Sequence, residues 1–230
     1  IKYAKKNKIT IPKDKKGAPP FSIDDNLFHT STEGKILENP KNPAPEFIFQ
    51  RTISPEKAPN KPTFVTINFK NSDPIGINGK KLSPYKLLEK LNQLAGKNGI
   101  GRVDLVENRF IGIKSRGVYE TPGGTILINA HRAMESVTLD KETMHKKDAV
   151  MPRYAELIYN GYWYSKERFK LQKIVDLQKN SVNGSVKLKL YKGNITIQSR
   201  ITKSKAYSIK KVSFEDNKPF SSLSPHLMYH

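Results

Sequence analysis

The sequence predicts an α+β fold in which helices pack on a mixed or antiparallel sheet. Residues 64–69, FVTINF, alternate apolar and polar side chains, which is the pattern of a half-buried strand. Residues 151–178 contain two consecutive helical segments, and strands are expected at 185–191 and 194–199, joined as a hairpin through Gly193. Because the helices are grouped and some strands form hairpins, these patterns favour α+β over a doubly wound parallel sheet.

The first part of the chain carries little regular pattern. We expect residues 1–20 to be a short helix followed by a connector, because lysines cluster there and Pro19-Pro20 ends the stretch. Residues 38–62 contain proline every few positions, which removes backbone donors and blocks a regular helix. A disordered linker is one interpretation of this segment. The apolar residues 47–49 favour the other, an ordered and extended segment that wraps over the domain.

The clearest helix lies between Ser83 and Gly96, after a tight turn at Asn78-Gly79. We expect Ser83 to be the N-cap, Pro84 the first helical residue and Gly96 the stop. Apolar residues of this segment fall on one face, which marks it as a packing element. They are Leu87, Leu88, Leu91, Leu94 and Ala95.

Residues 102–109 predict another strand, whose end brings Glu107 to the edge of the sheet. The run from Glu107 to Gly124 does not alternate or repeat as a packing element does, and it combines two acids, three cations, a phenol and four glycines. We therefore expect a loop that holds a ligand, because glycine permits positive φ and close approach of the backbone. Both signs of charge suit a zwitterion. Residues 125–134 are expected to be helical, and Ser165 to cap the second of the two later helices.

The net charge of +20 raises nucleic acid as a partner, because a concentrated basic face releases counterions when it binds phosphates. The distribution of the charge argues against that partner. Only eight of the 41 basic residues are arginine, and the lysines are scattered along the chain. We favour a solvated lysine surface, with a general attraction of anionic substrates as the alternative. The sequence contains no nucleic-acid-binding motif and no array of aromatic and basic residues.

Composition also bears on compartment and chemistry. No apolar run is long enough to span a bilayer, and the N-terminal residues lack the pattern of a signal peptide, so we expect a soluble cytoplasmic protein without a membrane partner. The absence of cysteine excludes disulfides, thiolate metal ligands and cysteine nucleophiles. The five histidines never show the short spacing of a metal pair, so no metal site is predicted.

Two long motifs resemble argininosuccinate synthase. One is ENRFIGIKSRGVYETPGG at residues 107–124, flanked by GRVDLVENR and TILINAHRAMES, and in the family this region closes over citrulline. The other is FSIDDNLFHTSTEGKILENPKNPAP at residues 21–45, where two serines nine residues apart contact the same substrate in the family. The resemblance extends to about Phe214 and implies the fold of that family's synthetase domain.

The resemblance is confined to the C-terminal synthetase portion of the family. The family's glycine-rich nucleotide loop, of the form SGGLDTS, does not occur in this sequence, and neither does its second glycine-rich segment for aspartate and nucleotide. We therefore expect residues 1–20 to be a helix remnant and connector from a missing nucleotide-binding domain. Residues 21–214 would form the synthetase domain, and residues 215–230 a tail that diverges from the family's segment leading to its C-terminal helix.

The resemblance implies ATP-dependent ligation of citrulline and aspartate through a citrullyl-adenylate, a step of arginine biosynthesis. ATP, with Mg, would be a co-substrate whose main site lies in the missing domain, so the chain alone would be inactive. The family also implies a homo-oligomer, a tetramer. The alternative is a non-catalytic remnant that serves as a structural or subunit-interaction protein.

Four residues match positions that contact citrulline in the family. Glu107 resembles a glutamate whose carboxylate accepts hydrogen bonds from the α-ammonium group, and Tyr119 resembles a tyrosine on the same substrate. Ser22 and Ser31 match the two serines. No catalytic side chain, cofactor ligand or metal ligand is assigned, because adenylate formation mainly needs positioning and electrostatic stabilisation.

Each of these residues has a structural alternative. Glu107 can be an internal ion-pair partner of Arg109 or Arg116. Tyr119 can be a core aromatic residue with its hydroxyl in water. Ser22 and Ser31 can be no more than caps.

Three neighbouring residues stay unassigned. Lys114 and Arg116 are candidate cations for a substrate carboxylate or phosphate, or structural partners of Glu107 or Glu120. Glu33 resembles an acid beside the site in the family, but Thr32 stands where a tyrosine is more usual.

Overall fold

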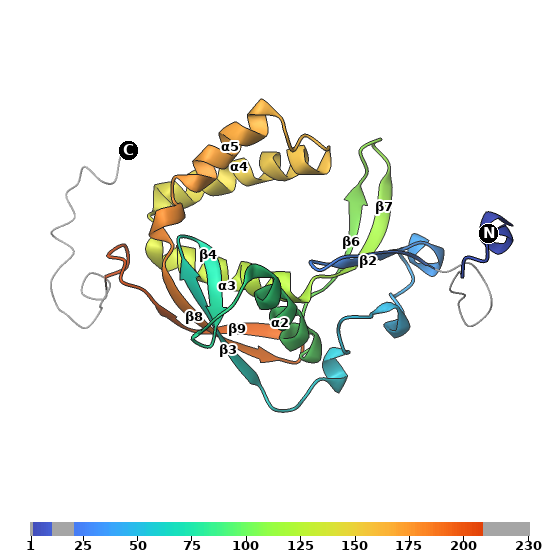
Figure 1. Cartoon of the computed structure of the whole chain (residues 1–230), viewed down its shortest axis with the longest axis horizontal. Helices are drawn as coiled ribbons and strands as arrows, with labels where there is room; N and C mark the ends of the chain where they lie inside the picture. The colour runs from blue at the N-terminus through green and yellow to red at the C-terminus, as the bar shows by residue number, and fades with distance from the viewer. Residues whose placement is uncertain (1, 11–20, 209–230) are drawn as a thin grey trace.

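The computed structural model describes residues 2–10 and 21–208, and it confirms the predicted α+β class (Figure 1). The strands form two sheets, and all pairings within them are antiparallel. Sheet A has the order β1-β2-β7-β6, and sheet B has the order β5-β4-β3-β8-β9. Sheet A contains β1 (Ser22–Asp25), β2 (Thr30–Glu33), β6 (Arg102–Asn108) and β7 (Lys114–Glu120). Sheet B contains β3 (Thr63–Lys70), β4 (Asp73–Ile77), β5 (Lys80–Lys81), β8 (Gly184–Tyr191) and β9 (Asn194–Ile201).

The main core lies between sheet B and two helices, α2 (Pro84–Lys97) and α3 (Pro122–Thr138). Alternate side chains of β3 are buried against these helices, as the period-2 pattern predicted. On the other face of sheet B, Phe64 is exposed beneath the ammonium of Lys187. The long helices α4 (Lys141–Tyr159) and α5 (Lys166–Asp176) pack against each other beyond α3 (Figure 1).

The proline-rich segment is extended, as predicted, and connects the two sheets. Between β2 and β3 the chain forms three short 3-10 helices, η1 (Lys35–Glu38), η2 (Glu46–Ile48) and η3 (Pro55–Lys57). A fourth, η4 (Lys179–Ser181), lies between α5 and β8. Of the three expected apolar anchors of the proline-rich segment, Ile48 is buried but Phe47 is 71% exposed. Ile48 packs with Leu37 and Val118, and Ala44 and Phe49 pack against this cluster. Polar contacts add to the attachment. Arg102 stacks on Phe49 at 3.7 Å and makes two hydrogen bonds to the carboxylate of Glu46.

The first helix, α1 (Lys2–Lys6), coincides with the helix expected at the start of the chain. The expected connector at 11–20 and the divergent tail at 215–230 lie outside the described residues. Within residues 2–10 and 21–208, no helix combines the length and the apolar character that crossing a bilayer requires.

The boundaries of three predicted helices were wrong. Gly96 lies inside α2, where it is required because an added Cβ would come 2.2 Å from the carbonyl oxygen of Arg51; the chain turns instead at Gly99, with φ of 70°. Helix α3 is longer than residues 125–134 at both ends. Helix α4 begins well before residue 151, where Asp140 accepts a hydrogen bond from the Thr143 amide.

A buried ionic cluster joins α3 to α4. Glu135, 1% exposed, receives the Lys147 ammonium and contacts His131 and Arg132, and Arg132 forms two 2.8 Å hydrogen bonds with Asp148. Burial raises the pKa of Glu135, but the hydrogen bonds from His131 and Lys147 outweigh it and lower that pKa to about 2.

The free energy of unfolding is expected to fall as the pH drops from about 4.5 toward about 2. The pKa of Glu135 is lower in the folded chain than in the unfolded chain. The ionised Glu135 carboxylate therefore contributes its full stabilisation at a pH above the pKa of the unfolded chain, and this stabilisation is lost as the pH falls to the pKa of the folded chain. Urea unfolding of the chain and of Glu135→Gln near pH 6 and near pH 3 checks this. The variant should lose less stability on acidification; an equal loss would mean that other carboxylates control the acid transition.

Candidate functional site

All four sequence-predicted site residues lie on one face of sheet A. In the register of the strands, Ser31 is opposite Tyr119, and Tyr119 is opposite Val103. Side chains alternate along a strand, so Glu107, four residues after Val103, lies on the same face as Tyr119. Glu33 is two residues after Ser31 in β2, so it shares the face of Ser31. Ser22 is opposite Glu33 and therefore lies on this face as well. The site face consists of Ser22, Ser31, Glu33, Glu107, Ser115 and Tyr119.

Tyr119 and Glu107 are in direct contact. The Tyr119 hydroxyl donates a 2.9 Å hydrogen bond to Oε1 of Glu107. Burial and this bond raise the pKa of Tyr119 to about 12, so its hydroxyl stays a donor. The alternative in which the hydroxyl faces only water is therefore wrong. The hydrogen-bond partner of the Tyr119 hydroxyl is Glu107, the acid that the sequence predicts as a substrate contact.

Residues 107–124 are largely a β-hairpin rather than the expected loop, so the predicted conformation was wrong, and the role of these residues in holding a ligand stays a prediction. Residues 114–120 form β7, and Gly112, with φ of 84°, lies in the turn of the hairpin. Gly117 is needed for a different reason than a positive φ. A Cβ at position 117 would come 2.7 Å from the Tyr119 ring. Because glycine has no Cβ, the ring can lie over position 117 and its hydroxyl can reach Glu107.

Arg109 lies between the two carboxylates of the site face. Its Nη2 is 2.5 Å from Glu33, its Nε donates to Ser115 Oγ at 2.6 Å, and its Nη1 is 3.7 Å from Glu107. The charge of Glu33 is the main cause that raises the pKa of Arg109, with a smaller contribution from Glu107. The ion pair of Glu107 with Arg109 is thus present but loose, and Glu33 holds the guanidinium more closely.

Arg116 and Lys114 have structural partners. Arg116 lies on the opposite face of sheet A, where its side chain is 8% exposed and forms hydrogen bonds to both carboxylate oxygens of Asp104. Its Nη1 also donates to the carbonyl of Asn42 at 2.8 Å, which fastens the segment after β2. The suggested pairing of Arg116 with Glu107 or Glu120 is therefore wrong. Lys114 donates to Asn108 across the hairpin.

The two serines differ in exposure. Ser31 is 6% exposed, whereas Ser22 is exposed at the start of β1, so Ser22 is a strand residue rather than a helix cap. Among residues 2–10 and 21–208, neither hydroxyl forms a hydrogen bond, and both remain available as donors. Ser22 lines a hollow of about 320 Å³, whose other walls are formed by Glu33, Gly34, Glu38, Lys114, Ser115 and Arg116.

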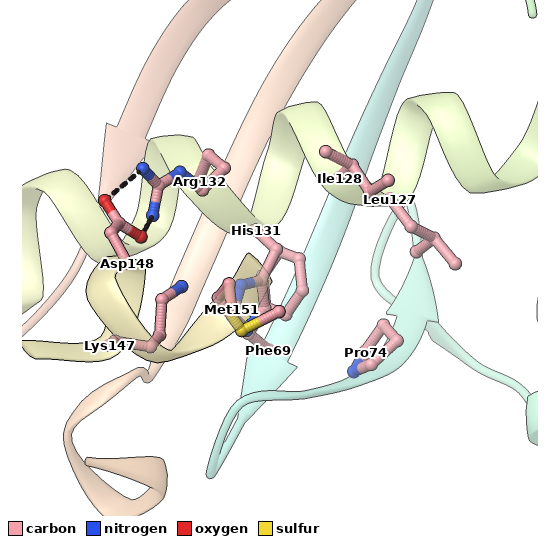
Figure 2. Close-up of a pocket in the computed structure, with 9 residues that line it drawn as sticks. All are labelled: Phe69, Pro74, Leu127, Ile128, His131, Arg132, Lys147, Asp148 and Met151. Atoms are coloured by element: carbon pink, nitrogen blue, oxygen red, sulfur yellow. Dashed lines mark hydrogen bonds and ion pairs between the residues drawn. The ribbon is translucent and has the colours of Figure 1, made fainter. Parts of the chain in front are cut away.

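A more apolar hollow, of about 490 Å³, lies away from the site face (Figure 2). Phe69, Pro74 and Met151 contribute to its walls, and its residues Arg132 and Asp148 pair with each other, as Figure 2 shows. None of the sequence-predicted site residues lines it. We therefore do not assign the site to this cavity.

Sequence reasoning missed two residues that adjoin the predicted site. Arg109 was considered only as a partner of Glu107, and Ser115 was not considered. The position of Ser115 follows once residues 114–120 are taken as a strand, because Ser115, Gly117 and Tyr119 then share a face.

Comparison with known proteins shows the family of this chain. The profile of the Arginosuccinate synthase C-terminal domain matches residues 21–225, which include both sheets. The chain belongs to the argininosuccinate synthase family. Similar proteins named argininosuccinate synthase include that of Pelagibacter ubique (strain HTCC1062), 84% identical over 221 residues, or 96% of this chain and 56% of that protein. Those of Granulibacter bethesdensis and Zymomonas mobilis are each 58% identical over 217 residues, 94% of this chain and 52% and 53% of theirs. The chain thus spans about half the length of these curated relatives.

Proposed function

We propose that this chain supplies the citrulline-binding wall of an argininosuccinate synthase. In the complete enzyme, the ureido oxygen of citrulline attacks the α-phosphate of ATP and gives a citrullyl-adenylate and pyrophosphate. The amino group of aspartate then displaces AMP and gives argininosuccinate. The adenylate is needed because the ureido carbon is a poor electrophile until its oxygen carries a phosphoryl group.

One observation supports this proposal above the others. The four residues that match citrulline contacts come from four separate strands, and the folding of sheet A gathers them on one face. Two of them, Tyr119 and Glu107, are already hydrogen-bonded to each other. Residues selected by motif alone would not be expected to converge in this way unless the motif belongs to one site.

The chemistry of the site face suits the α-amino-acid end of citrulline. An ionised carboxylate has about four acceptor positions, so Glu107 can keep the Tyr119 bond and still accept hydrogen bonds from an α-ammonium group. The hydroxyls of Ser22 and Ser31 can donate to the α-carboxylate. These residues position the substrate, and none of them acts as a nucleophile.

ATP, with Mg, and part of the aspartate site are assigned to the portion of the curated relatives that lies outside the span matched by this chain. In the described residues, no group of three or more His, Asp or Glu side chains could hold a metal ion. Residues 1–20 would connect to the nucleotide-binding domain, residues 21–214 would form the synthetase domain, and residues 215–230 a divergent tail. The whole would act in the cytoplasm as a homotetramer, as the family resemblance implies.

The isolated chain is expected to show no citrulline-dependent exchange between ATP and pyrophosphate, because the residues that cradle the phosphates are absent from it. The test compares the isolated chain with a complete synthase, made by joining the nucleotide-binding portion of the Pelagibacter ubique relative to this chain. Exchange by the complete synthase alone supports the proposal. Exchange by the isolated chain contradicts it, and no exchange by either favours a non-catalytic remnant.

A further inference from the structure

The guanidinium group of Arg109 lies beside the Glu107 carboxylate without forming a hydrogen bond to it. A guanidinium group beside Glu107 competes with any substrate ammonium for the same carboxylate. Nevertheless, Nη1 of Arg109 stays 3.7 Å from Glu107 Oε1, beyond hydrogen-bonding distance. The other two nitrogens of the group are engaged, Nη2 with Glu33 at 2.5 Å and Nε with Ser115 at 2.6 Å.

Glu33 is placed to hold Arg109 back from Glu107. It lies at the end of β2, its side chain is 28% exposed, and its charge is the main cause that raises the pKa of Arg109. Arg109 is in the β6–β7 hairpin, where its amide and carbonyl bond to Ile113 and Gly112. The backbone of Arg109 is therefore fixed, whereas its guanidinium group can pair with the carboxylate of either Glu33 or Glu107.

We propose that Glu33 is a positioning residue that keeps Arg109 off Glu107 and so leaves the Glu107 carboxylate open to the ammonium group of the substrate. This inference rests on the proposed citrulline site. Arg109 is retained near the site, where its charge keeps the two carboxylates from repelling each other. Glu33 itself does not contact the substrate.

Loss of the Glu33 charge removes the stronger of the two carboxylate attractions on Arg109. The guanidinium then needs to move only about 1 Å to reach the 2.7–2.9 Å of a charge-assisted hydrogen bond to Glu107. In that arrangement the substrate ammonium must displace an internal cation, and binding weakens even though no direct contact has been lost.

The test measures citrulline binding by the complete synthase and by Glu33→Gln, Arg109→Gln and the double variant. Glu33→Gln is expected to bind citrulline at least about tenfold more weakly. Arg109→Gln, which removes the competitor, should bind no more weakly than the parent. The double variant should recover to within about threefold of the parent, because without Arg109 there is no cation for Glu33 to restrain.

Asp104→Asn provides the matched control. Asp104 pairs with Arg116 in the same sheet but on the opposite face, so this variant loses a comparable ion pair and should keep the parent's affinity. Crystal structures of the ligand-free parent and Glu33→Gln give a readout without citrulline. The Arg109–Glu107 contact should close to hydrogen-bonding distance in the variant only.

The outcomes separate this inference from the proposed function. Unchanged citrulline affinity in Glu33→Gln overturns the positioning role. A weakened affinity that the double variant does not recover also overturns it, because that result means that Glu33 touches the substrate or maintains the fold. If the parent itself fails to bind citrulline, the proposed function fails, and the crystal structures still decide whether Glu33 restrains Arg109.

Discussion

Glu107→Gln in the complete synthase is expected to weaken citrulline binding by about 1.5–3 kcal/mol, roughly 10- to 150-fold. The substitution keeps the size of the side chain and removes the charge that meets the α-ammonium group. The fold should be little changed, because the remaining amide oxygen can still accept the hydrogen bond that Tyr119 donates to Glu107. Isothermal titration with citrulline, together with the melting temperature of each protein, checks both parts.

Tyr119→Phe is the companion variant. It removes one hydroxyl and one hydrogen bond to Glu107, and a cost of roughly 0.5–1.5 kcal/mol in citrulline binding is expected, less than that of Glu107→Gln. The reverse pattern would be decisive. If Glu107→Gln lowers the melting temperature substantially while citrulline binds as before, Glu107 is a structural partner of Arg109 and the site assignment is wrong.

Much of the fold could be predicted because the relevant segments bury one face. The strand at 64–69 alternates against the core, and Ser83 caps α2 as expected, accepting a hydrogen bond from the Lys86 amide. Strand β7 could not be found in this way. It has polar residues on both faces, with Ser115 and Tyr119 on one and Arg116 on the other, so no hydrophobic alternation marks it.

The site was predicted from the family motifs rather than from the chemistry of single residues. A glutamate in a charged run more often forms an internal ion pair, and nothing in the local sequence distinguishes Glu107 from such a residue. The partner of Arg116 depended on the register of β6 and β7, which periodicity does not give. The pairing of Ser31 with Tyr119 joins residues far apart in the chain and required the folded sheet.

Glu120→Ala is expected to lower the free energy of unfolding by at least about 3 kcal/mol. Glu120 is 2% exposed, and its carboxylate accepts hydrogen bonds from the backbone amides of Gln50, Arg51 and Thr52 at 2.8, 2.9 and 2.8 Å, and from the Thr52 hydroxyl at 2.7 Å. Truncation leaves these donors without an acceptor, and each buried donor so left costs about 1–3 kcal/mol. Urea unfolding at neutral pH measures the loss.

Glu46→Ala is the matched control for this prediction. Glu46 also ties the extended segment to sheet A, through two hydrogen bonds from Arg102, but its side chain is 53% exposed. An exposed ion pair contributes at most about 1 kcal/mol, so this variant should unfold almost as the parent does. If both variants lose the same small amount, the segment is held chiefly by Ile48 and the stacking of Arg102 on Phe49, and the buried carboxylate is dispensable. A large loss confined to Glu120→Ala means that the acid at the end of β7 fixes the extended segment to sheet A, on the opposite face from Tyr119 and Glu107.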